Sequence, residues 1–220
     1  MDKTAIRDAA TIIILRNATT EPAVLMGQRG KSAAFMPGKF VFPGGAIDAN
    51  DAVVPQTKMP EPHAARLAQH SNLAPNTIAA AAIRELWEET GQLLGAPATW
   101  DRPPQGWRGF AATGHQPHAA ALSFFFRAVT PKGAARRFDA RFLLADAASL
   151  VGDLDDFSGA EDELSHLQWV KLTEARNFDL PFITQVVMAE LMAFVPNCDT
   201  IESVPFFRND NADRLATRLR

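Results

Sequence analysis

Short apolar runs separated by turn-forming residues occupy the first fifty positions of the chain. Residues 10–15 and 23–26 are apolar, and residues 17–22 between them are rich in Asn, Thr and Pro. Two runs of strand length around such a segment predict a β-hairpin. A third run, residues 40–42, stops at Pro-Gly-Gly in positions 43–45. Because proline cannot donate to a strand ladder and glycine adopts unusual backbone angles, we expect a sharp turn there.

The strongest helical pattern of the chain covers residues 77–90, which are rich in Ala, Glu and Leu. Asn76 or Thr77 is suited to cap the start of this helix, and Gly91 is suited to end it. The preceding segment, residues 46–76, is rich in Pro, Asp, Asn and Gln. It predicts mostly loop, with a short helix over residues 63–70.

Further strands and a closing helix are expected in the second half. Residues 119–129 and 137–145 predict strands, the latter alternating apolar with charged side chains, and residues 164–172 predict another. The apolar residues 182–194 predict a helix, and the tail after Pro196 predicts irregular structure. Mixed strands with few helices favour an α/β sandwich around a mixed sheet.

Composition narrows the class of protein. A chain of 220 residues, 47% hydrophobic and 21% charged, buries one substantial core, so we expect one domain over residues 1–220. No apolar run approaches the roughly 20 residues that cross a bilayer, so no membrane partner is expected. The net charge of −3 argues against nucleic-acid binding. A start without signal-peptide pattern and a single cysteine, Cys198, predict a cytoplasmic protein.

The chemistry lies in the sequence Arg-Glu-Leu-Trp-Glu-Glu-Thr-Gly at positions 84–91. On a helix, Glu85, Glu88 and Glu89 share one side. Three crowded carboxylates cost stability unless a cation neutralises them, and their hard oxygens suit Mg²⁺ or Mn²⁺. Taken alone, this segment also fits a solvated acidic face with an internal Arg84–Glu88 pair.

Phe-Pro-Gly-Gly at positions 42–45 followed by this run resembles the signature of the Nudix hydrolases. That signature reads Gly, five residues, Glu, seven residues, then Arg-Glu-apolar-x-Glu-Glu-x-Gly-apolar. The matching residues are Gly45, Arg84, Glu85, Leu86, Glu88, Glu89 and Gly91. The resemblance implies a Nudix-type α/β/α sandwich around a mixed β-sheet. It also implies a metal-dependent hydrolase that cleaves the diphosphate linkage of a nucleoside diphosphate derivative.

The chain departs from the signature in three ways. The family places 13 residues between the glycine and the arginine, whereas 38 separate Gly45 from Arg84, so 25 residues are inserted at about positions 46–76. Asp51 stands at the position of the first glutamate of the signature, which leaves open whether the shorter side chain reaches the helix. Gln92 replaces the final apolar residue. A working site requires the glycine turn to dock, and we expect it beside the N-terminal half of the helix, with the insertion looping out.

The resemblance also implies roles for the matching residues. Glu85 and Glu89 are the expected principal metal ligands, with Glu88 a further ligand or water-mediated contact and the Gly44 carbonyl another oxygen ligand. Arg84 is expected to orient a neighbouring carboxylate. The general base comes either from the helix or from a late loop containing Glu161, Asp162 and Glu163, of which we select Glu163. The alternative for this acidic triplet is a solvated turn.

The wider pattern over residues 29–45 resembles coenzyme A diphosphatases with a long insertion. Arg29 and Gly38 match that branch, whereas Ala34 stands in place of a second arginine. Coenzyme A or acyl-coenzyme A is therefore the favoured substrate. Open alternatives are another nucleotide, such as a dinucleotide or nucleotide sugar, and a non-hydrolytic nucleotide-binding module, which has no need of three clustered glutamates. A Nudix-fold isomerase lacks its active-site cysteine here.

The substrate itself is expected to be a small nucleotide diphosphate. Arginine grips phosphate in a bidentate way, lysine acts as a point charge, and an aromatic ring suits a pocket wall. The selected substrate contacts are Arg29, Phe35, Lys39, Gly45 and Arg141, with Lys31 and Arg137 as further cations. For each cation, an ordinary surface position is the alternative. A homodimer is left open.

Overall fold

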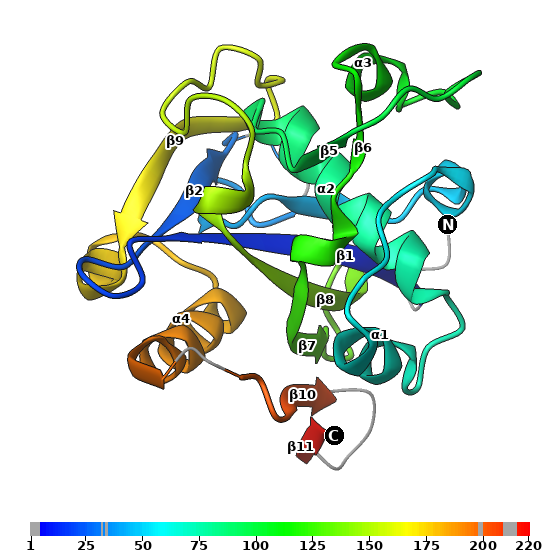
Figure 1. Cartoon of the computed structure of the whole chain (residues 1–220). Helices are drawn as coiled ribbons and strands as arrows, with labels where there is room; N and C mark the ends of the chain where they lie inside the picture. The colour runs from blue at the N-terminus through cyan, green and yellow to red at the C-terminus, as the bar shows by residue number, and fades with distance from the viewer. Residues whose placement is uncertain (1–4, 32, 34, 198–199, 209–214) are drawn as a thin grey trace.

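A mixed β-sheet forms the centre of the fold, with helices on both of its faces (Figure 1). The structure is a computed structural model that describes residues 5–31, 33, 35–197, 200–208 and 215–220. Within these residues, nine strands join one sheet in the order β11-β10-β7-β8-β1-β2-β3, with β4 pairing with β1 and β9 with β2. Ala34 and Cys198 lie outside the described residues.

Parallel and antiparallel pairs both occur in this sheet. β1 runs parallel to β8, and β7 runs parallel to β10, whereas the other pairs of the sheet are antiparallel. The expected mixed α/β fold is therefore confirmed. The strands are β1 Ile6–Arg16, β2 Ala23–Arg29, β3 Phe40–Val41, β4 Gly44–Ala46, β7 Ser123–Val129, β8 Arg137–Asp146, β9 Leu164–Lys171, β10 Val204–Arg208 and β11 Leu215–Leu219.

The remaining elements surround the sheet. A separate hairpin pairs β5 Gly95–Pro97 with β6 His115–Pro117. The α-helices in the described residues are α1 Glu61–Ala68, α2 Pro75–Thr90, α3 Arg108–Ala112 and α4 Phe182–Phe194. Short 3-10 turns are η1 Ala49–Val53, η2 Ala119–Ala121, η3 Ala147–Ser149, η4 Leu172–Asn177 and η5 Val195–Asn197. No helix in the described part of the chain is long and apolar enough to span a bilayer.

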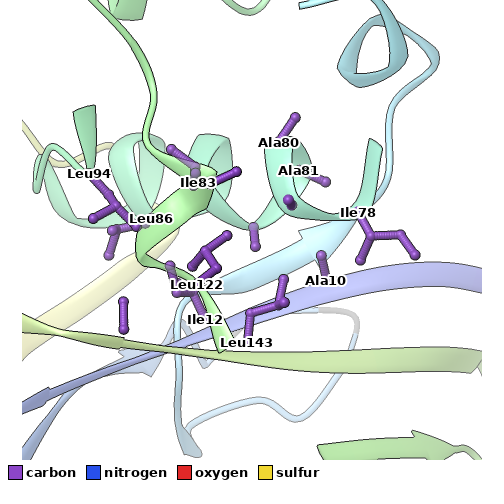
Figure 2. Packing of buried hydrophobic residues seen from close by; sticks show 14 of the residues in the cluster. Ala10, Ile12, Ile78, Ala80, Ala81, Ile83, Leu86, Leu94, Leu122 and Leu143 are labelled. Carbon is purple, nitrogen blue, oxygen red and sulfur yellow. The ribbon is translucent and has the colours of Figure 1, made fainter. Parts of the chain in front are cut away.

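The alternation of side chains along β1 divides the core into two layers. Ala10, Ile12 and Ile14 pack in the cluster that contains α2, whereas Ile13 and Leu15 pack in the cluster that contains α4. Successive strand residues point to opposite faces, so one central strand serves both layers. Figure 2 shows the α2 side, where Ala10 and Ile12 lie below the helix.

α2 is buried on all sides along its first half, and this decides where the insertion goes. Residues 78–83 are fully buried, including four consecutive alanines. The inserted segment contributes Val54, Met59 and Leu67 to the same cluster. The expectation that the insertion only loops out is therefore wrong. A helix that is apolar all round needs cover on the side away from the sheet, and the insertion provides it.

Several sequence predictions agree closely with the structure. β1 and β2 form the expected hairpin, with Leu15 opposite Val24. The predicted helix at residues 182–194 matches α4, and the short helix predicted near residues 63–70 corresponds to α1. Gly91 ends α2 in the left-handed conformation, with φ of 73° and its N–H donating to Trp87 O.

Other predictions need correction. α2 begins at Pro75 without a side-chain cap, so Asn76 and Thr77 lie inside the helix; proline suits the first helical position because its missing N–H has no partner there. Residues 119–121 form a 3-10 turn before β7. The tail predicted as irregular contains β10 and β11, which extend the sheet beyond β7.

Candidate active site

The glycine turn docks onto the helix of glutamates. The Gly44 N–H donates to Glu89 Oε2 at 2.8 Å. A Cβ atom at Gly45 would lie 2.5 Å from Glu85 Oε2, so only glycine allows this approach. β4 holds the turn against β1, with Gly45 opposite Ala10. The separated parts of the motif meet as expected, but at the C-terminal half of α2 rather than the N-terminal half, because the glutamates stand in its last two turns.

Asp51 reaches the helix despite its short side chain. Arg84 Nε lies 2.9 Å from Asp51 Oδ1, and Arg84 Nη2 lies 3.1 Å from Asp51 Oδ2. Asp51 is 0% exposed and also accepts the Asp48 N–H at 2.8 Å. η1, which carries Asp51, lies directly against α2. Asp51 therefore pairs with Arg84 although its side chain is shorter than the glutamate of the signature.

Arg84 connects this aspartate to two of the glutamates. Its Nη1 donates to Glu85 Oε1 at 2.9 Å and to Glu88 Oε2 at 2.8 Å. Burial alone would lower the pKa of Arg84, but the hydrogen bond to Asp51 and the charges of the three carboxylates outweigh burial and raise it. Arg84 therefore stays charged and is hydrogen-bonded to the neighbouring carboxylates.

Burial shifts the three glutamates toward their protonated forms. It raises the pKa of Glu85 to about 7, and Arg84 offsets part of this shift. Burial also raises the pKa of Glu88, and it raises that of Glu89 well above its ordinary value. Glu89 is 2% exposed, and its Oε1 is buried without a hydrogen-bond partner. A buried, unpartnered carboxylate oxygen is costly unless a cation or proton satisfies it.

The late acidic loop lies against the end of α2. The Glu161 N–H donates to Glu88 O at 2.8 Å. Glu163 is exposed, and after burial its charge is among the causes that raise the pKa of Glu85 and Glu89. Gln92 Nε2 binds the loop carbonyls of Asp153 and Asp156 at 3.1 and 2.9 Å. Gln92, at the last position of the signature, therefore connects this loop to the end of α2.

Arg29 approaches the glutamates from β2. Its Nε is buried and has no hydrogen-bond partner. Burial raises the pKa of Glu89, and the positive charge of Arg29 offsets part of that increase. Gly38 closes the following loop, with φ of 73° and its N–H donating to Arg29 O at 3.1 Å. The positive charge of Arg29 beside the cluster is suited to an anionic ligand, because arginine binds phosphate through charge-assisted hydrogen bonds.

The other predicted substrate contacts are engaged elsewhere. Lys39 pairs with Asp179 at 2.5 Å. Phe35 packs edge-on against Phe138 of β8, with 5.0 Å between ring centroids. Arg141 is 1% exposed and is held by Asp8 and Asp139, so it is enclosed in the fold and we drop it from the substrate contacts. Of the two further cations, Lys31 is exposed, and Arg137 is buried and donates to Thr130 O.

The donor set suits a hard divalent cation. Within the described residues, no three His, Cys, Asp or Glu side chains already stand in the arrangement of a metal centre. Arg84 and the Gly44 N–H hold oxygens of the three glutamates in the hydrogen bonds given above. The buried Glu89 Oε1, however, is an oxygen that has no hydrogen-bond partner among the residues that the structure describes. Such oxygens are the ligands that Mg²⁺ and Mn²⁺ prefer, so the residues present fit a cation.

Sequence reasoning missed Trp107, which completes the surroundings of Asp51. Trp107 is fully buried, and its Nε1 donates to Asp51 Oδ1 at 3.1 Å. The two residues are 56 positions apart, and nothing in their spacing links them. The only hint in the sequence is the presence of three tryptophans at positions 87, 100 and 107, close after the insertion.

Comparisons with known proteins agree with this geometry. No protein-family model matches the chain. A stretch of 87 residues is 38% identical to "Putative nudix hydrolase 7" of Caenorhabditis elegans; it covers 40% of this chain but only 22% of that protein's length. A crystal structure of a Nudix hydrolase from Alicyclobacillus acidocaldarius is similar with a TM-score of 0.62 and 28% identity, over 86% of this chain and 92% of the other.

A second structural neighbour supports the fold alone. It is the Nudix domain of Shewanella oneidensis NrtR in complex with ADP-ribose, with a TM-score of 0.50 and 13% identity, over 86% of this chain and 88% of the other. Nudix hydrolases generally use divalent metal ions, in keeping with the oxygen-rich cluster on α2. The chain, with its glycine turn seated on the glutamate helix, is thus similar to Nudix hydrolases in part of its sequence and in its fold.

Proposed function

We propose that the chain is a Mg²⁺- or Mn²⁺-dependent diphosphohydrolase acting on a nucleoside diphosphate derivative. The observation that carries the proposal is Glu89, whose buried Oε1 lacks a partner beside Glu85. Glu85 and Glu89 are the proposed principal ligands, with Glu88 and the Gly44 carbonyl as further ones. A divalent ion at this position would replace the protons that burial now favours on these carboxyls.

When bound, the ion would neutralise charge on the diphosphate and lower the pKa of a nearby water. A water oxygen would attack one phosphorus while the bond from this phosphorus to the bridging oxygen breaks, and the leaving phosphate would keep the electron pair. Glu163 accepts the water's proton. It is exposed, so it exchanges that proton with solvent.

Two arginines have distinct proposed roles in this reaction. Arg29, with its unpartnered Nε, binds a phosphate oxygen of the substrate. Arg84 contacts neither substrate nor metal. It holds Glu85 and Glu88 in place through Nη1 and is itself held by Asp51. Gly45 keeps the floor of the site free of any side chain.

Coenzyme A or acyl-coenzyme A is the substrate we favour. Support comes from the pattern over residues 29–45, in which Arg29 and Gly38 are in backbone contact. A second hydrogen bond, from Gln28 Nε2 to Gly38 O at 2.9 Å, also holds this loop. A dinucleotide or a nucleotide sugar is the alternative substrate. The cytoplasmic location and the homodimer stay predictions.

A hydrolysis panel tests this function. The protein is incubated with Mg²⁺ and, separately, coenzyme A, acetyl-coenzyme A, ADP-ribose, a dinucleoside polyphosphate or a nucleotide sugar, and the products are separated by chromatography. From coenzyme A we expect 3′,5′-ADP and a phosphopantetheine product. E89Q serves as the inactive control.

The possible results separate the alternatives. Cleavage of another diphosphate without cleavage of coenzyme A would remove only the favoured substrate. Binding of nucleotides with no turnover of any panel member at saturating Mg²⁺ would contradict the hydrolase and favour a nucleotide-binding module.

A further inference from the structure

The segment between α2 and β7 leaves the sheet and folds back over the glutamate helix (Figure 1). It contains β5, α3 and β6, and it places two fully buried side chains, Trp107 and Phe110, in the core on the α2 side. Phe110 packs edge-on against Trp87 of α2, with 6.0 Å between ring centroids, and also against Trp107 at 5.3 Å. The segment is therefore anchored on α2 through Trp87, which lies between Glu85 and Glu88 in the sequence.

Close packing fixes this contact. A Cβ atom at Gly109 would lie 2.4 Å from the Trp87 ring, so the backbone of α3 rests directly on that side chain. Trp100 extends the same aromatic group, with 6.0 Å between its ring centroid and that of Trp107. Rings packed in this way have little freedom to reorient. The indole of Trp107 is thus held in one position.

The N–H of that indole points at Asp51. Trp107 Nε1 donates to Asp51 Oδ1 at 3.1 Å, and the same oxygen accepts Arg84 Nε at 2.9 Å. Asp51 has no exposed surface, so each of its oxygens depends on protein donors. With the Asp48 N–H on Oδ2, Trp107 completes the hydrogen bonding of this buried carboxylate.

We propose that Trp107 is a positioning residue of the metal site, acting through Asp51 and Arg84. This inference rests on the proposed function, because it assumes a cation at Glu85, Glu88 and Glu89. Without the indole N–H, Asp51 binds Arg84 less rigidly. The guanidinium, which already donates to Glu85 and Glu88, is then held less firmly, and it no longer fixes their carboxylates in the orientation that the cation requires.

This positioning role of Trp107 compensates for two departures of the chain from the Nudix signature. The aspartate at position 51 is one methylene shorter than the glutamate of the family signature, and 25 extra residues separate its segment from the helix. A donor from a third segment, itself anchored on Trp87, restores a fixed position to Asp51. Groups behind metal ligands commonly affect metal affinity although they do not touch the ion.

The test compares W107F with W100F. Phenylalanine keeps an aromatic ring but removes the indole N–H together with part of the side-chain volume, so W100F controls for the lost volume. Trp100 belongs to the same aromatic group, but its Nε1 donates to His115 O at 3.0 Å and has no hydrogen bond to Asp51 in the structure. We expect W107F to weaken Mn²⁺ binding, measured from the electron paramagnetic resonance signal of free Mn²⁺, by about 10-fold. W100F should leave Mn²⁺ binding unchanged.

Two further measurements separate positioning from packing. W107H keeps a ring N–H but packs worse, so positioning predicts that it binds Mn²⁺ better than W107F, whereas a packing role predicts the reverse. In a D51N background, W107F should weaken Mn²⁺ binding no further. In the unmutated protein, Mg²⁺ should shift the nuclear magnetic resonance of the Trp107 indole N–H more than that of Trp100, a measurement that does not require any Trp107 variant to fold.

Each outcome bears on a defined claim. Equal effects of W107F and W100F, an additive effect in D51N, or an unshifted Trp107 N–H would overturn the positioning role and leave the proposed function intact. An unmutated protein that binds no Mn²⁺ and hydrolyses nothing would overturn the proposed function, and this inference with it.

Discussion

Gly45 lies directly against the carboxylate of Glu85. A Cβ atom at this glycine would come within 2.6 Å of both carboxylate oxygens, and β4 cannot retreat because it pairs with β1. The glycine thus limits where the carboxylate of a proposed metal ligand can lie. Glu85 is held between the backbone of the turn and a guanidinium, and its carboxylate has little freedom to move.

The substitution G45A should therefore disable the site while leaving the fold in place. The added methyl group has to displace the Glu85 carboxylate by a large fraction of an ångström or more. Misplacement of about 1 Å near a reacting centre costs about 100-fold in rate, so we expect turnover to fall by that factor. G30A is the matched control, since a Cβ atom at Gly30 meets nothing within 4 Å. Equal activity of the two variants would show that the turn does not shape the site.

Neutralising Glu89 should be the most damaging of the carboxylate changes. E89Q keeps the size of the side chain, but it replaces a charged oxygen ligand with a weaker neutral amide. We expect turnover to fall by about 100-fold or more, as for the loss of one strong electrostatic contact to the transition state. The melting temperature without metal should hold or rise, because a buried carboxylate with a raised pKa is removed. Near-normal turnover of E89Q at saturating Mg²⁺ would contradict the assignment of α2 as the metal site.

The stability of the metal-free protein should decrease from acid to neutral pH. Burial raises the pKa of Glu85 to about 7 and raises that of Glu89, so the folded state binds more protons than the unfolded chain. The stability gained from the protonated Glu85 carboxyl is fully present below the ordinary value of 4.5 and is lost as pH rises through about 7; the raised pKa of Glu89 contributes in the same direction.

Melting curves in the presence of a chelator test this pH dependence. We expect the melting temperature to fall between about pH 5 and about pH 8. The fall should be smaller in E85Q/E89Q, which no longer has these two titrating groups, and added Mg²⁺ should oppose it in the unmutated protein. A double variant with the same pH profile as the unmutated protein would assign the effect to other groups.

Arg29 should affect substrate binding more than the neighbouring Lys39. R29Q removes a cation whose positive charge opposes the burial-driven rise in the pKa of Glu89. We expect the KM to rise about 10-fold or more, the usual effect of losing a charge-assisted hydrogen bond. K39Q breaks only the pair with Asp179 and should change KM little. Steady-state kinetics on whichever diphosphate the panel identifies decide this; a larger effect of K39Q would restore Lys39 as a substrate contact.

Local sequence patterns predicted those elements that form from apolar periodicity and turn composition alone. The hairpin of β1 and β2 and the closing helix α4 follow from apolar periodicity and turn composition, and both are present. The tail strands β10 and β11 escaped prediction because β10 gains its partner from β7, with Phe206 opposite Arg127. A pairing between segments so distant in the sequence leaves no periodic trace in either one.

The spacing of Glu85, Glu88 and Glu89 by itself determined that three carboxylates share one side of a helix, because helical geometry acts within two turns. Only the tertiary structure decided their surroundings. Asp51 is 33 positions from Arg84, and Trp107 is 56 from Asp51, yet all three meet in one buried group. These contacts depend on how the insertion and the segment after α2 pack over the buried part of that helix. Such packing is set by the shape and volume of many side chains together, which no local spacing encodes.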